Sequence, residues 1–170
     1  ATPGGGSAAA AAGAMAAGLA AMVASMSRGK KAYLQYEAQL SEAIARLGAL
    51  REELKAAIDV DAESYNSVMK AYKLAKTVSA QEGEALIEAG LKQATSVPLG
   101  VAEKSREVAR LASSLEAITN PNMKSDLTTA QALARAAITG ALANVEINLA
   151  SLKDRVFAEE VRKRAEGLRV

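Results

Sequence analysis

The chain has 170 residues, half of them apolar, with one Phe, four Tyr and no Trp, and its 21 basic and 19 acidic residues leave a formal net charge of +2. This length supports one domain with a sizeable core, and the balanced charge argues against a nucleic-acid-binding surface. The chain contains no Cys and no His, which excludes thiolate and imidazole nucleophiles, bases and metal ligands and leaves acid–base chemistry to Asp, Glu, Lys or Tyr.

The first predicted element is an alanine-rich helix over residues 7–27, with Ser7 as its N-cap and the preceding PGGG as an irregular loop. Because this helix is apolar on every side, we expect it at the centre of a helix bundle. Its apolar run has nearly the length of a membrane span. The Ala and Gly content and the lack of a basic segment ahead of it favour a buried helix over a membrane span or signal peptide.

The second predicted helix covers residues 30–74 and carries a stripe of residues whose spacing alternates between four and three. The stripe consists of Leu40, Ile44, Leu47, Arg51, Leu54, Ile58, Asp61, Tyr65, Val68 and Tyr72. Such spacing predicts packing along the whole length of the helix. Arg51 can extend its charge to solvent, whereas the side chain of Asp61 is too short to do so.

A third helix is predicted from the capping-box spacing of Ser79 and Glu82. Pro98 interrupts its pattern, so we expect either a kink or the start of a new helix there.

The segment TNPNMKSD is the clearest predicted loop, and we expect Ser125 or Asp126 to cap the helix that follows, which runs to about Leu152. A short amphipathic helix is expected after Asp154. The sequence therefore predicts an all-α, single-domain bundle of about five to six helices over residues 1–170, with long antiparallel helices.

Asp61 is the first candidate for acid–base chemistry. It lies on the packing stripe, whereas Asp59 and Glu63 point away from it. Desolvation would raise the pKa of the Asp61 carboxyl toward the range useful for a general acid or base. The alternative is a structural ion pair, with Arg51 or with a lysine of another helix, and the sequence leaves both interpretations open.

Two further motifs have polar groups that could contact a ligand. The glycines Gly4, Gly5 and Gly6 precede a helix start, where free backbone N–H groups can bind an anion, although a flexible cap is the commoner explanation. The P-loop signature GK[ST] is absent. Lys30 and Lys31 could hold a carboxylate-rich tail or form a solvated turn.

Asp126 and Asn144 share a face of one predicted helix but lie about 27 Å apart along it, so they cannot serve one small site within a single subunit. Asn144 and Asn148 fit ligand contact or helix–helix hydrogen bonding, and the second interpretation is favoured.

Six segments occur in an order that resembles the cyclodeaminase/cyclohydrolase family: TPGGGSAAA, SRGKK, DVDAESYNSVMKAYKL, ATSVPLGVAE, NPNMKSD and GALANVEINLASLKD. The family includes the cyclodeaminase domain of formiminotransferase-cyclodeaminase and methenyltetrahydrofolate cyclohydrolases. The resemblance covers nearly the whole chain. It implies an all-helical homodimer that acts on tetrahydrofolate derivatives, and we expect a cytoplasmic location.

The resemblance also implies site residues, with Asp61 as the acid–base group, Asp126 as the second choice, and the remaining matched positions in substrate binding. These positions are Gly4, Gly5, Gly6, Ser7, Lys30, Lys31, Asn120, Asn122, Ser125, Asn144 and Asn148. Family members have a short helical segment before PGGGS and a longer final helix, so we expect the ends of this chain to be trimmed.

The expected reaction is hydrolysis of methenyltetrahydrofolate to formyltetrahydrofolate, without a metal or redox cofactor. The alternatives are a formiminotetrahydrofolate cyclodeaminase that releases ammonia, and a non-catalytic bundle that binds folate or a partner helix. A homodimer is expected on physical grounds as well, because the alanine-rich helices and the long stripe present more packing surface than one subunit can cover.

Overall fold

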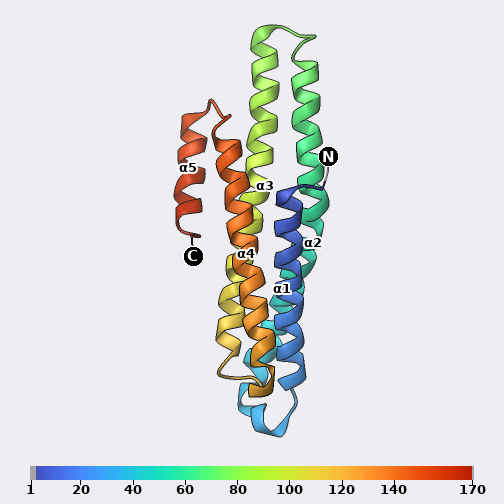
Figure 1. The fold of residues 1–170 in the computed structure, drawn as a ribbon, viewed down its shortest axis with the longest axis vertical. Helices are drawn as coiled ribbons and strands as arrows, with labels where there is room; N and C mark the ends of the chain where they lie inside the picture. The colour runs from blue at the N-terminus through green and yellow to red at the C-terminus, as the bar shows by residue number, and fades with distance from the viewer. Residues whose placement is uncertain (1–2, 170) are drawn as a thin grey trace.

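The computed structural model describes residues 3–169, and within them the secondary structure is entirely helical. Five α-helices form one domain, which confirms the predicted all-α bundle (Figure 1). In chain order the elements are α1 (Gly5–Ser27), the 3-10 turn η1 (Lys31–Tyr36), α2 (Glu37–Leu74), α3 (Ala80–Leu115), the 3-10 turn η2 (Pro121–Met123), α4 (Lys124–Leu149) and α5 (Arg155–Glu166).

Helices α1 to α4 run side by side, and α5 packs on the outside against α3 and α4 (Figure 1). The lengths are unequal: α2 and α3 have 38 and 36 residues, whereas α1 has 23. The hairpin of α2 and α3 therefore projects beyond the N-terminal end of α1 (Figure 1). This mismatch in length leaves the inner face of the hairpin uncovered by α1 just beyond Gly5.

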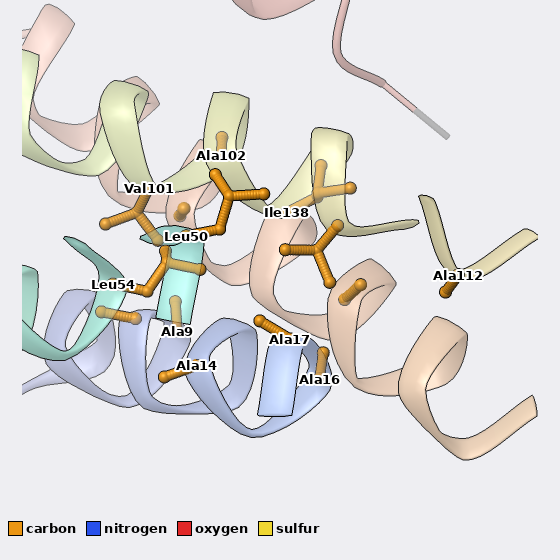
Figure 2. Packing of buried hydrophobic residues seen from close by; sticks show 14 of the residues in the cluster. Ala9, Ala14, Ala16, Ala17, Leu50, Leu54, Val101, Ala102, Ala112 and Ile138 are labelled. Carbon is orange, nitrogen blue, oxygen red and sulfur yellow. The ribbon is translucent and has the colours of Figure 1, made fainter. Parts of the chain in front are cut away.

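The small residues of α1 allow close packing against α2, α3 and α4. Figure 2 shows Ala9 and Ala17 facing the larger side chains of the neighbouring helices, among them Leu50 and Leu54. At Gly13 a Cβ atom would lie 2.6 Å from Ser105 Oγ and 3.2 Å from Leu54 Cδ1. The α1 backbone thus approaches its neighbours more closely than a larger residue would allow.

One face of α1 is open, which corrects the expectation that the helix is enclosed on every side. Met15, Met22 and Met26 are 57%, 39% and 56% exposed, respectively. By length and composition α1 also meets the criteria for a membrane span, but one such helix is weak evidence because a buried core helix meets the same criteria. Its contacts with three neighbouring helices fit the buried-helix interpretation.

The predicted starts of α1 and α4 are wrong, and α2 also begins later than predicted. Helix α1 begins at Gly5 with Gly4 as its N-cap, so Ser7 is a buried residue of the first turn and not the cap. Helix α4 begins at Lys124, which places Ser125 and Asp126 inside its first turn. In both cases the chain reaches helical dihedrals before the residue with the best capping side chain. At α1 the hydroxyl of that residue, Ser7, is bonded to Asp61 instead.

Other predicted boundaries are confirmed. Ser79 and Glu82 form the capping box at the start of α3, and Asp154 caps α5 by accepting hydrogen bonds from the N–H groups of Val156 and Phe157. Helix α3 continues through Pro98, so no new helix starts there. The segment before α2 differs from the prediction, since it forms the 3-10 turn η1 instead of an extension of α2.

Candidate active site

A cavity of about 400 Å³ lies where the first turn of α1 meets the α2–α3 hairpin and the C-terminal half of α4. Its lining includes six of the predicted site residues and several others. The lining residues are Gly4, Gly5, Gly6, Asp61, Ala62, Ser64, Tyr65, Val68, Tyr72, Leu91, Ala94, Asn144, Asn148 and Ser151. Three helices thus contribute polar groups to one open cavity beside the N-terminal end of α1.

Asp61 is held in this cavity by the first turn of α1. Ser7 Oγ donates a hydrogen bond to Asp61 Oδ2 over 2.9 Å and lies 3.0 Å from the carbonyl oxygen of Ile58. The half-buried Asp61 carboxylate also lies beside the positive end of the α1 dipole, a favourable position for an anion. The alternative of an ion pair with Arg51 is not what the structure shows, because Arg51 pairs with Glu52 over 2.9 Å.

The residue at position 6 must be glycine because the Asp61 carboxyl group lies directly against it. A Cβ atom on Gly6 would lie 2.7 Å from the carboxyl carbon of Asp61 and 2.8 Å from its Oδ2. A Cβ on Gly5 would lie 3.3 Å from Asn144 Nδ2, whereas one on Gly4 would meet nothing within 4 Å. The glycines therefore form the first turn of α1 and let the backbone approach the carboxylate, which corrects the expectation of an irregular loop.

The orientation of Asn148 depends on Pro98. Proline has no N–H group, so within α3 the carbonyl oxygen of Ala94, four residues earlier, cannot receive its usual helical hydrogen bond. Asn148 Nδ2 donates to this oxygen over 2.8 Å. This bond confirms the predicted helix–helix hydrogen bond and leaves the Asn148 side-chain oxygen as the acceptor available to the cavity.

Asn144 is oriented within its own helix, since its Nδ2 donates to the Gly140 carbonyl oxygen over 2.8 Å. The cavity wall thus carries two amides whose nitrogens are bonded to backbone carbonyls. Which atom of each amide is nitrogen follows from these hydrogen bonds. Their oxygens are suited to accept hydrogen bonds from N–H groups of a ligand.

The remaining predicted site residues lie at the other end of the bundle. Lys30 and Lys31 follow the C-terminal end of α1, about 33 Å from Gly5 at the usual helical rise. Asn120 lies beside that end, because its N–H group donates to Ser27 Oγ over 3.0 Å, and Asn122, Ser125 and Asp126 follow it at the start of α4. One subunit therefore presents two separate groups of predicted residues.

Several cavity residues were missed by the sequence reasoning. Tyr65, Val68 and Tyr72 belong to the same stripe as Asp61, so the stripe itself was the signal that could have identified them. Leu91, Ala94 and Ser151 gave no such signal, because their place in the cavity depends on how α3 and α4 pair with α2.

The fold and the site define the class of protein: a helical-bundle domain with a carboxylate and two oriented amides in one cavity. A family model described as formiminotransferase-cyclodeaminase matches residues 1–167. The chain belongs to the formiminotransferase-cyclodeaminase family.

Similar proteins are enzymes of folate one-carbon chemistry by name, which confirms the resemblance seen in the sequence motifs. The chain is 41% identical to a methenyltetrahydrofolate cyclohydrolase of Methylorubrum extorquens, over 98% of this chain and 81% of that protein. It is 34% identical to the formimidoyltransferase-cyclodeaminase of Sus scrofa, over 99% of this chain, but spans only 31% of that protein. The crystal structure of a formiminotetrahydrofolate cyclodeaminase from Thermotoga maritima matches with a TM-score of 0.90 and 33% identity, covering 98% of this chain and 80% of that one.

Replacement of Gly6 by alanine should destabilise the fold by about 1–3 kcal/mol, because the added methyl group overlaps the Asp61 carboxyl. Gly48→Ala is the matched control: Gly48 lies inside α2 with open space around its Cβ position, so that change should stabilise the protein by up to about 1 kcal/mol. Denaturant unfolding measures both free energies. Addition of Asp61→Ala to the Gly6→Ala variant should recover stability, and a Gly6→Ala protein as stable as the wild type would contradict the contact.

The link between Pro98 and Asn148 predicts a coupled pair. Asn148→Ala should cost about 1–3 kcal/mol of unfolding free energy, because it leaves the buried Ala94 carbonyl without its side-chain donor. In a Pro98→Ala background the backbone N–H of residue 98 can donate to that carbonyl, so the same Asn148→Ala change should cost much less. A double-mutant cycle measures the coupling, and strictly additive effects would refute it.

Proposed function

We propose that this protein is a folate one-carbon enzyme that hydrolyses methenyltetrahydrofolate to formyltetrahydrofolate. The observation that carries the proposal is the Asp61 carboxylate, fixed by Ser7 inside a cavity with the amides of Asn144 and Asn148. The 41% identity over 98% of the chain to a protein named for this hydrolysis supports the same reaction. The part of the cavity that carries the amides suits a pterin, because the amide oxygens can accept hydrogen bonds from the N–H groups of the pterin ring.

In the proposed reaction a water molecule adds to the methenyl carbon, which is held between two folate nitrogens. Asp61 takes a proton from that water as the C–O bond forms, which gives a neutral hydroxylated adduct. Asp61 then returns the proton to the nitrogen that leaves as one C–N bond breaks. The hydroxyl proton of the adduct passes to solvent as the formyl C=O forms, so atoms and charge balance.

A single carboxylate can perform both proton transfers because it is a base in the first step and an acid in the second. The reaction changes no oxidation state, so the proposal requires no redox cofactor. The methenyl carbon is already a cationic electrophile, so the proposal includes no metal either. The proposed location is the cytoplasm, with which a chain that lacks cysteine is compatible.

Formiminotetrahydrofolate cyclodeaminase activity is the second candidate, favoured by the structural match to the Thermotoga maritima cyclodeaminase. In that reaction a folate nitrogen adds to the formimino carbon and ammonia leaves, so Asp61 would move a proton between the same kinds of atoms. One preparation tested with both substrates separates the two activities. A bundle that binds folate tightly and converts neither compound would support the third, non-catalytic alternative.

The proposal includes a homodimer formed through the open face of α1. A groove of about 690 Å³ runs along this face and is lined by Ala11, Ala14, Met15, Gly18, Leu19, Met22, Arg51, Lys55, Ile58 and Leu133. It is almost entirely apolar and is centred on the middle of α1. An exposed apolar surface of this kind is typical of a subunit interface.

If the two-fold axis crosses the middle of this groove perpendicular to α1, as we propose, the two copies of α1 are antiparallel. The C-terminal end of α1 in one subunit would then lie beside the N-terminal end in its partner. The second group of predicted residues, which includes Lys30, Asn120 and Asp126, would thereby approach the cavity of the other subunit. Such a dimer explains why residues that the family resemblance assigns to one site lie at opposite ends of the helix bundle in one subunit.

Asp61→Asn should lower turnover by about two to four orders of magnitude with the fold intact, the usual contribution of a positioned acid–base group. Loss of methenyltetrahydrofolate absorbance above the uncatalysed rate measures turnover, and circular dichroism monitors the fold. Asp59→Asn is the control, because Asp59 is exposed outside the cavity and its replacement should have little effect. Activity of the Asp61→Asn protein within a few-fold of wild type, with unchanged dichroism, would refute the role of Asp61.

Met15→Glu should dissociate the dimer, because it places a charge in the middle of the apolar groove. Light scattering should give the wild type about twice the 17.5 kDa mass of one chain at micromolar concentration, and the variant that mass alone. Met69→Glu, on an exposed methionine of the hairpin, should leave the dimer intact. A wild-type protein that scatters as a monomer would overturn the dimer.

A further inference from the structure

The cavity has two unlike walls. Asn144 and Asn148 of α4 and the following Ser151 line one side, whereas Tyr65, Val68, Tyr72 and Leu91 of the α2–α3 hairpin line the other. The hairpin pairing places Leu91 near Val68, because a Cβ on the neighbouring Gly90 would lie 3.6 Å from Val68. Asp61 lies where both walls meet the first turn of α1.

Tyr65 and Tyr72 are the largest side chains of the hairpin wall. Both are large and lie open to the cavity, with 51% and 42% of their surface exposed. Tyr65 follows Asp61 by one helical turn and Tyr72 follows Tyr65 by two, so all three share one face of α2. The hairpin projects beyond the N-terminal end of α1 (Figure 1), and both rings keep a large exposed surface.

We infer that Tyr65 and Tyr72 form an aromatic wall that binds the aminobenzoyl ring of the folate and sets the direction in which the substrate enters the cavity. This inference rests on the proposed function. It assigns the pterin to the α4 wall that contains Asn144 and Asn148, and the aminobenzoyl ring to the hairpin wall. The glutamate group then points toward the tip of the hairpin.

The chemistry of the substrate requires this order. The methenyl carbon joins a pterin nitrogen to the nitrogen that carries the aminobenzoyl ring, so the reacting atom lies between a polar ring system and an apolar one. When that atom meets Asp61, the pterin can lie against the amides of α4 while the aminobenzoyl ring lies against the tyrosines of the hairpin. Tyr65 begins about 6 Å along α2 from Asp61, within reach of a ring attached directly to the reacting nitrogen. A flat aromatic ring packs well against tyrosine and small apolar side chains such as Ala94.

The four tyrosines of the chain provide a direct test. Tyr33 and Tyr36 belong to η1 at the opposite end of α1, which the proposed dimer brings toward the cavity of the partner, so their signals report on the dimer and do not decide the inference. We would label the tyrosine rings isotopically, assign the four ring signals with single Tyr→Phe variants, and titrate the protein with 5-formyltetrahydrofolate, a stable folate. The expected result is a shift of the Tyr65 and Tyr72 signals.

The fragment p-aminobenzoylglutamate, which lacks the pterin, should shift the same two tyrosine signals and leave the side-chain amides of Asn144 and Asn148 unmoved. If 5-formyltetrahydrofolate shifts those amides but neither tyrosine, the aromatic wall is wrong and the proposed function stands. If the fragment moves the amides instead, the direction of binding is reversed and the inference fails. If no signal in the cavity responds to the folate, the proposed function fails with it.

Kinetics give an independent readout. Tyr65→Leu should raise KM for methenyltetrahydrofolate about tenfold and change kcat by no more than about threefold, because the wall binds the substrate without touching the reacting atoms. Tyr65→Phe keeps the ring and should restore KM to within about threefold of wild type. A residue of purely structural importance would not raise KM while leaving kcat nearly unchanged. Equal KM values for the wild-type and Tyr65→Leu enzymes would overturn the inference.

Discussion

The contact between Gly6 and Asp61 is the constraint on which the candidate site depends. It allows the first turn of α1 to lie directly against the carboxylate, so that Ser7 can donate a hydrogen bond to it. The same close approach brings Gly5 beside the side-chain amide of Asn144. The acid, the hydroxyl that holds it and the amide are thus positioned by one helix start. Because a single Cβ atom would separate them, the glycine run is a requirement of the site.

The rest of the cavity follows from two departures from regular helix packing. Pro98 removes one hydrogen bond from α3, and the carbonyl oxygen that it leaves unpaired orients Asn148 of α4. The N-terminal end of α1 is at Gly5, whereas α2 and α3 extend beyond that level. The inner face of the hairpin is therefore not covered by α1, and its tyrosines line the cavity. A missing donor and a short helix together convert the interior of a bundle into a binding site. The apolar face of α1 is the corresponding feature of the proposed assembly, because an antiparallel pair of subunits would bring the two groups of predicted residues together.

Local patterns in the sequence were sufficient for most of the fold. The helix spacing, the capping box at Ser79 and Glu82 and the cap at Asp154 predicted the all-α bundle and two of its helix starts, since these signals depend only on neighbouring residues. The start of α1 was misplaced because Ser7 is a good capping residue by type, and only its distance from Asp61 shows that its hydroxyl is engaged elsewhere. The stripe through Asp61 and Tyr65 was likewise visible in the sequence. The sequence did not show which residues of the stripe lie in the core and which line a cavity.

The sequence by itself determined the helices, the absence of thiol and imidazole chemistry, and the prominence of Asp61 among the acids, because each follows from residue type and helical spacing. Only the tertiary structure decided which residues share a site. It placed Gly5, Asp61 and Asn148 around one cavity and Lys30 and Asn120 at the far end, although all belong to the same predicted set. The physical reason is that separation along a helix is fixed by its rise, whereas proximity between helices depends on how their side chains pack. The hydrogen bond that orients Asn148 joins residues 94 and 148, and no local pattern contains that pairing.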